Sequence, residues 1–129
     1  MNKQIKEYLK NYSDDLNIVN KLIVSAYLEF NNLKVTHNKH LLSLLSGNDK
    51  NEIESFLKLV YSHSDVFNFE DVINLFEITI PSKDIVVNGA IYTPNYIREY
   101  INRSTVSKLN ITDKTKIADI ACGSGAFLY

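Results

Sequence analysis

Apolar side chains in the first 80 residues recur every three or four positions, which is the spacing of one face of an α-helix. The pattern predicts short helices over residues 3–12 and 37–46, and a longer helix that begins after Asp14 or Asp15. The longer helix carries one apolar stripe, made of Leu16, Val19, Leu22, Ile23, Ala26, Tyr27, Phe30 and Leu33. We expect this stripe to face a helical core, and docking to a partner protein is the alternative.

Polar residues that suit helix ends divide the rest of this region. Gly47 is a stop signal for the helix over 37–46, whose buried side is expected to be His40, Leu41, Leu44 and Leu45. Asp49-Lys-Asn-Glu52 approximates a capping box and opens a fourth helix, with a stripe of Ile53, Phe56, Leu57, Val60 and Tyr61. Asn68 is expected to cap a fifth, which Pro81 ends and which buries Phe69, Val72, Ile73, Phe76 and Ile80. Residues 1–80 are therefore predicted to form a helical module.

The spacing of apolar residues no longer follows the helical pattern after Pro81. Residues 85–87 and 90–92 are apolar and flank the turn signal Asn88-Gly89, so they are predicted as two short strands. Thr93 at the cap and Pro94 at the first helical position then predict a helix. Its buried side is expected to be Ile97, Tyr100 and Ile101.

A short apolar run at residues 117–120 is followed by glycines. Such a run is typical of a buried parallel strand, and a strand, a glycine turn and a helix start form the first unit of a doubly wound α/β sheet. A dinucleotide fingerprint would need glycine at Leu128, and the lysine of a phosphate-binding loop is missing. The carboxylate of Asp119 before the turn suits an ammonium better than a pyrophosphate. The residues therefore favour S-adenosylmethionine, which carries an ammonium and a sulfonium.

Two segments resemble the cofactor motifs of one enzyme family. Asp119-Ile-Ala-Cys-Gly-Ser-Gly-Ala-Phe-Leu128 resembles the S-adenosylmethionine motif of adenine-N6 DNA methyltransferases, above all those of Type I and Type IIG restriction–modification enzymes. The usual family pattern has proline where Ile120 stands. Gly89-Ala-Ile-Tyr-Thr-Pro94 is similar to the family's other cofactor motif, and the two occur in the γ-class-like order. The resemblance covers roughly residues 85–129.

The resemblance implies a fold and a set of cofactor contacts. Residues 81–129 would be the incomplete, truncated beginning of an α/β Rossmann-like catalytic domain that follows the mainly α module. Asp119 would hold the ammonium of the cofactor, and Phe127 would pack near the ligand. The full set implied for the cofactor is Tyr92, Thr93, Pro94, Asp119, Ala121, Cys122, Gly123, Ser124, Gly125 and Phe127. The structural alternatives are an ordinary strand-to-helix turn and a Thr-Pro helix cap.

The activity implied is methyl transfer from S-adenosylmethionine to adenine N6 in duplex DNA, after base flipping. No residue is predicted to be catalytic, because the Asn-Pro-Pro-Tyr/Phe motif that receives the flipped adenine does not occur in these 129 residues. We expect the chain alone to be inactive and to bind the cofactor weakly or not at all. Duplex DNA, and possible further restriction–modification subunits, would be bound through other regions. The alternative is a non-enzymatic helical interaction module that keeps a vestigial methyltransferase start.

Composition adds limits on partners and compartment. Residues 1–80 hold 8 Lys and Arg against 11 Asp and Glu, while residues 81–129 hold 6 against 4, so neither part has the basic excess typical of DNA binding. One cysteine excludes an internal disulfide, and no apolar stretch suits a signal or a membrane span, so a cytoplasmic protein is expected. His37 and His40 lack a third ligand at zinc spacing, so no metal is expected. A solvated helix face, rather than DNA phosphate contact, is expected for Arg98, Arg103 and Lys108.

Overall fold

The computed structural model describes residues 3–47, 49–80, 93–120, 122–123 and 125–128. The chain divides into two compact units, Met1–Ile80 and Pro81–Tyr129. The described part of the first unit consists of helices and the loops between them, so its predicted helical character is confirmed.

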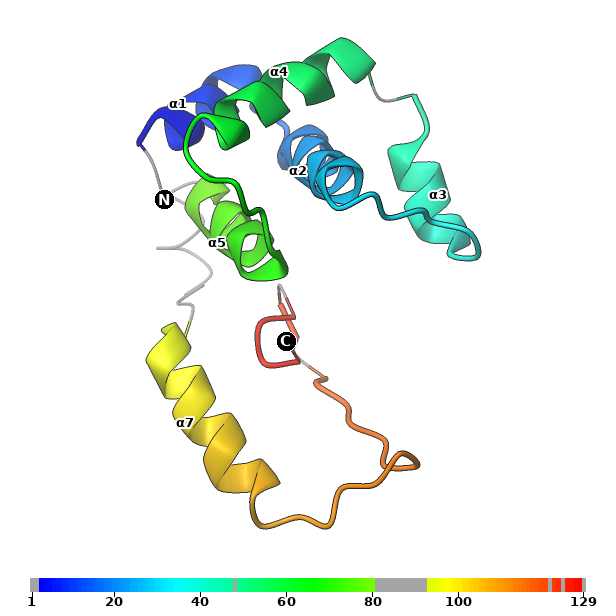
Figure 1. The fold of residues 1–129 in the computed structure, drawn as a ribbon, viewed down its shortest axis with the longest axis vertical. Helices are drawn as coiled ribbons and strands as arrows, with labels where there is room; N and C mark the ends of the chain where they lie inside the picture. Colours follow the sequence, from blue (N-terminus) through cyan, green and yellow to red (C-terminus); the bar gives the residue numbers. More distant parts are fainter. Residues whose placement is uncertain (1–2, 48, 81–92, 121, 124, 129) are drawn as a thin grey trace. The chain divides into compact units, whose positions relative to one another are not determined.

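Five helices make up the described part of the first unit (Figure 1). Their bounds are α1 Lys3–Tyr12, α2 Leu16–Phe30, α3 Lys39–Leu45, α4 Lys50–Tyr61 and α5 Phe69–Thr79. The central helix is α2, which contacts α3, α4 and α5, while α1 contacts α5. The longest apolar stripe in the sequence therefore belongs to the helix with the most helical neighbours.

The core lies where α1, α2, α4 and α5 meet. Its buried residues are Ile5, Leu9, Val19, Leu22, Ile23, Ala26, Ile53, Phe56, Leu57, Val60, Phe67, Val72, Ile73 and Leu75. Aromatic rings connect the helices around it: Tyr8 of α1 stacks on Phe56 of α4, with ring centroids 5.7 Å apart. Most of these residues lie on the predicted stripes, as expected for amphipathic helices that bury one face each.

Capping side chains set the helix starts. The caps of α2, α3, α4 and α5 accept backbone N–H groups, and they are Asp15, Asn38, Asp49 and Asn68. A reciprocal capping box forms in α5, where Asn68 and Asp71 each bind the other's backbone N–H. In α4, where the sequence indicated such a box, the Glu52 carboxylate instead accepts a hydrogen bond from the Tyr12 hydroxyl.

Several details of the first unit differ from the prediction. Tyr61, expected on the buried stripe of α4, is 53% exposed. The short α3 buries no residue, and His40 and Leu44, expected on its buried side, are exposed. The main helical contact of α3 is with α2, which leaves much of its surface uncovered. Leu33 is exposed because α2 ends before it. Phe67, in the loop before α5, was not predicted to be buried, yet its ring packs edge-on against Phe30 at a centroid distance of 5.8 Å.

The second unit contains α7, Asn95–Val106. The helix begins one residue later than predicted: Pro94, not Thr93, occupies the cap position, with no capping hydrogen bond from a side chain. The predicted buried side was also wrong. Tyr100 is 72% exposed and Ile101 is 41% exposed, whereas Arg98 is only 5% exposed.

No strand occurs among the residues that the structure describes. Residues 117–120 were predicted as a buried strand, but Ile117 is 66% exposed and Ile120 is fully exposed. A buried parallel strand needs at least one neighbouring strand and helices that cover both faces of the sheet, and the described part of this unit contains no other strand. The strands predicted over 85–87 and 90–92 lie outside the described residues.

None of the helices described combines the length and the apolar character that crossing a bilayer requires.

Candidate functional site

The glycine motif forms a tight turn. Gly123 has φ +53 and Gly125 has φ +81, values in the left-handed region that side chains disfavour. The Gly125 N–H donates to the Cys122 carbonyl at 2.7 Å, and the Leu128 N–H donates to the Gly125 carbonyl at 3.0 Å. The backbone geometry thus favours glycine at both positions.

The two glycines also leave open space. A Cβ atom built on either glycine would have no neighbouring atom within 4 Å. Cys122 and Gly123 are exposed, while Gly125 and Phe127 are half-buried. A ligand could therefore approach the backbone at the glycines, as an S-adenosylmethionine motif requires.

The structure describes three of the other predicted cofactor residues outside the turn. Asp119 is half-buried three residues before Cys122. Thr93 is half-buried and Pro94 is exposed at the start of α7, where the Pro94 carbonyl accepts the Ile97 N–H at 3.0 Å. The remaining members lie outside the described residues, and they are Tyr92, Ala121 and Ser124.

Two side chains of α7 bind the segment that follows the glycines. The Arg98 guanidinium donates through Nη1 to the Ala126 carbonyl at 2.8 Å. The Asn102 amide donates through Nδ2 to the Phe127 carbonyl at 3.1 Å. The helix that begins after Thr93-Pro94 is therefore bonded directly to the glycine motif.

Sequence reasoning missed both residues. Arg98 was expected on a solvated face, because a charged side chain is rarely buried, and Asn102 was not considered. Their only shared signal is a spacing of four positions, which places them on the same face of α7. Arg103 behaves as predicted: its side chain is 83% exposed, and it pairs with Glu99 at 3.7 Å.

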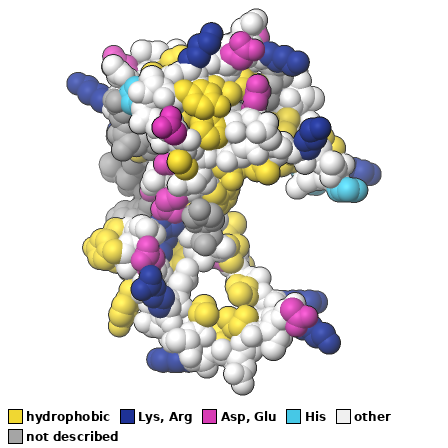
Figure 2. Space-filling view, viewed as in Figure 1, with side chains coloured by type: hydrophobic (Ala, Val, Ile, Leu, Met, Phe, Trp, Pro, Cys, Tyr) yellow, Lys and Arg dark blue, Asp and Glu magenta, His cyan; other side chains and the backbone are white. Residues whose placement is uncertain are grey.

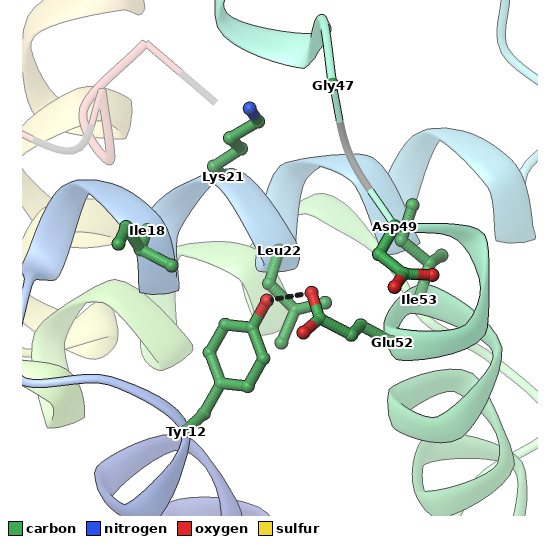
Figure 3. A pocket seen from close by; sticks show the side chains of 8 residues that line it. All are labelled: Tyr12, Ile18, Lys21, Leu22, Gly47, Asp49, Glu52 and Ile53. Carbon is green, nitrogen blue, oxygen red and sulfur yellow. Dashed lines mark hydrogen bonds between the residues drawn. The ribbon is translucent and has the colours of Figure 1, made fainter.

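A second candidate site lies within the first unit (Figure 3). It is a cavity of about 220 Å³ lined by Tyr12, Ile18, Lys21, Leu22, Gly47, Asp49, Glu52 and Ile53. The Tyr12 hydroxyl donates to Glu52 Oε2 at 2.6 Å, and Lys21 Nζ donates to the Ser46 carbonyl at 2.7 Å. These hydrogen bonds connect elements of the first unit, which gives the polar groups a structural role.

The chemistry available in this cavity is limited. Burial raises the pKa of the Tyr12 phenol, and the hydrogen bond to Glu52 raises it further. A phenol whose pKa is raised stays protonated at neutral pH and cannot act there as a base or a nucleophile. Another cavity, of about 320 Å³, adjoins α5 and is lined by both apolar and polar side chains.

No group of three His, Cys, Asp or Glu side chains suited to a metal ion occurs in the described part of the chain. Comparison with models of protein families, with curated proteins and with solved structures gives no match for this chain.

Proposed function

We propose that the chain is the N-terminal part of an adenine-specific DNA methyltransferase of a restriction–modification system. Residues 119–127 and 92–94 would contribute to its S-adenosylmethionine site, and residues 1–80 would form the helical module before the catalytic domain. The observation that carries the proposal is the pair of hydrogen bonds from Arg98 and Asn102 to residues 126 and 127. They join the helix after the Thr-Pro motif to the glycine motif, as expected if both motifs serve one ligand.

The residues present suit the cofactor. Gly123 and Gly125 offer backbone without side chains over open space, so a ligand can lie against them. The Asp119 carboxylate has the charge to hold an ammonium, and the half-buried Phe127 ring offers apolar surface near the turn. When bound, S-adenosylmethionine supplies a methyl group carried on a sulfonium.

Recognition of DNA is assigned to other regions of the enzyme. On the face that Figure 2 shows, Lys and Arg side chains are separated by acidic, apolar and uncharged ones. The net charge of −1 gives this chain no general attraction to phosphates. Duplex DNA, and further restriction–modification subunits where the system has them, would therefore be bound outside these 129 residues. The cytoplasm, where DNA and cofactor are both present, is the proposed compartment.

A methyl-transfer assay tests the proposal. A polypeptide that joins these 129 residues to the region encoded after them is incubated with tritiated S-adenosylmethionine and duplex DNA. We expect label on adenine N6 and an Asn-Pro-Pro-aromatic motif in the added region, and we expect no transfer by residues 1–129 alone. Label on cytosine, or no transfer with such a motif present, would contradict the proposal.

A second candidate function is a non-enzymatic helical interaction module. It is favoured by α3, which buries none of its residues. In this helix Leu42 is 43% exposed and Leu44 is 40% exposed. Exposed leucines on a short helix can anchor a partner helix in a groove. A stop codon directly after Tyr129, together with an absence of methyl transfer, would favour this candidate over the enzyme.

A further inference from the structure

Arg98 and Asn102 contact two consecutive carbonyl groups directly after the glycine turn. The distances are 2.8 Å from Arg98 Nη1 to the Ala126 oxygen and 3.1 Å from Asn102 Nδ2 to the Phe127 oxygen. Residues four apart on an α-helix lie one above the other on the same face. The two side chains therefore form a pair of donors spaced along α7, and each binds one of two successive peptide groups.

The glycine turn needs support of this kind. Its two glycines have positive φ values, and glycine has more backbone conformations open to it than any other residue. The described residues around the turn belong to no strand or helix, so no regular ladder holds the carbonyl groups of Ala126 and Phe127. The side-chain donors of Arg98 and Asn102 bind these two carbonyl groups instead.

Burial strengthens the hydrogen bond from Arg98 to the Ala126 carbonyl. The Arg98 residue is only 5% exposed, and a guanidinium removed from water must find acceptors inside the protein. A hydrogen bond from a charged donor is stronger than one between neutral groups, and the weakly hydrated, planar guanidinium suits such a place. A residue held in this way keeps its partner segment in one position.

We propose that Arg98 and Asn102 are positioning residues that clamp residues 126–127 to α7 and thereby hold the glycine turn in one conformation. That the turn held in this way binds S-adenosylmethionine rests on the proposed function; the clamp itself does not. The Thr-Pro start of α7 and the glycine turn would then move as one unit, so that a change at either motif is transmitted to the other through α7.

Amide-proton exchange of the turn tests the clamp. The N–H groups of Gly125 and Leu128 close the turn, so their exchange rates, measured by NMR on the full 129-residue chain, report how often it opens. Arg98→Met keeps the length of the side chain without its donors, and Asn102→Leu does the same for the amide. We expect either change to accelerate both exchange rates about two- to tenfold, the effect of losing one net hydrogen bond.

Two further variants distinguish a specific positioning role from a general disturbance of α7. Arg98→Lys keeps a cationic donor and should retain part of the protection. Arg103→Met removes an exposed arginine from the same helix and should leave both rates unchanged. The Ser107 N–H, which donates to the Arg103 carbonyl at 3.1 Å, reports whether α7 itself stays folded. Wild-type rates in Arg98→Met and Asn102→Leu, or equal acceleration in Arg103→Met, would overturn the proposal.

Adding S-adenosylmethionine to the same samples keeps the clamp and the proposed function distinguishable. If the clamp variants loosen the turn and the ligand protects amides of the helical unit rather than those of the turn, the clamp stands and the cofactor assignment fails. If both clamp variants exchange at wild-type rates without ligand while the ligand protects the turn, the cofactor site stands and the clamp fails.

Discussion

Tyr12 carries the clearest electrostatic effect at the scale of single residues. Its hydroxyl lies 2.6 Å from Glu52 Oε2 and connects α1 to α4. Burial and this hydrogen bond raise the pKa of the phenol above its usual value of about 10. The folded protein therefore holds the phenolic proton more tightly than the unfolded chain does, and stability depends on that proton.

The stability of the first unit should fall at alkaline pH for this reason. The contribution of Tyr12 to the free energy of unfolding is complete below about pH 10 and declines as the pH rises above it. Tyr12→Phe should lower the free energy of unfolding by roughly 1 kcal/mol at pH 7 and should reduce the loss of stability between pH 9 and 11. Urea denaturation at each pH measures both effects. The control is Tyr61→Phe, which keeps the ring stacked on Phe30. Equal pH profiles for Tyr12→Phe and the wild type would refute the assignment.

Gly123 is the residue on which the cofactor assignment depends most. In the complete enzyme that we propose, Gly123→Val should abolish methyl transfer, because a branched side chain is strained at φ +53 and would fill the space next to the backbone. Asp119→Asn should weaken cofactor binding roughly ten- to a hundredfold, since it removes a charge but keeps an acceptor. Tritiated-methyl transfer and cofactor affinity are measured together. Near-normal transfer by Gly123→Val would show that the glycine turn is not the cofactor site.

At the scale of helices, the stability lost when a capping side chain is removed should depend on how many core residues that helix buries. Asn68 caps α5, which buries Val72, Ile73 and Leu75, whereas Asn38 caps α3, which buries nothing. Asn68→Ala should therefore lower the free energy of unfolding by about 1 kcal/mol, and Asn38→Ala should change it by much less. Urea denaturation monitored by circular dichroism measures both. Equal losses from the two changes would contradict the view that α3 lies outside the cooperative core.

The helices of the first unit could be predicted from the sequence because each carries its own local signals. An apolar stripe at helical spacing marks α2, α4 and α5, and Asp15, Asp49 and Asn68 mark where they begin. Phe67 could not be found in this way, because a buried loop residue has no periodic neighbours. Its position depends on the Asn31 side chain at the end of α2, which donates to the Phe67 carbonyl at 2.9 Å.

The second unit was predicted less well, for a different physical reason. Periodicity shows which side of a helix is apolar, but a side becomes buried only where a partner covers it. On α7 the segment that lies against the helix offers carbonyl groups, so the polar Arg98 is buried and Tyr100 stays exposed. The candidate glycines could be found from sequence, because φ values above zero favour glycine. The donors that hold the turn could not.

At the scale of the whole molecule, the first unit contains a complete core. Every residue of its buried cluster lies between Ile5 and Leu75. A fragment of residues 1–80 should therefore fold alone, with a helical circular dichroism spectrum and the same urea midpoint as this unit shows in the full chain. Phe56→Ala, which empties a fully buried position, should destabilise the fragment by about 3–5 kcal/mol. Leu42→Ala, at an exposed position, should lower the free energy of unfolding by less than about 0.5 kcal/mol. A random-coil spectrum for the fragment would disprove its independence.

The central claim, that residues 119–127 bind S-adenosylmethionine, is tested most directly by NMR titration of the ¹⁵N-labelled 129-residue chain. Binding should be weak, with a dissociation constant of roughly 1 mM or above, because in the proposed enzyme the adenine and ribose would be held by residues outside these 129. The amide signals of Asp119, Gly123 and Gly125 should shift, while those of residues 3–80 stay in place. ATP, which shares the adenosine but carries phosphates, should not produce the same shifts. Shifts confined to the helical unit, or the same shifts of these three amides with ATP, would contradict the claim.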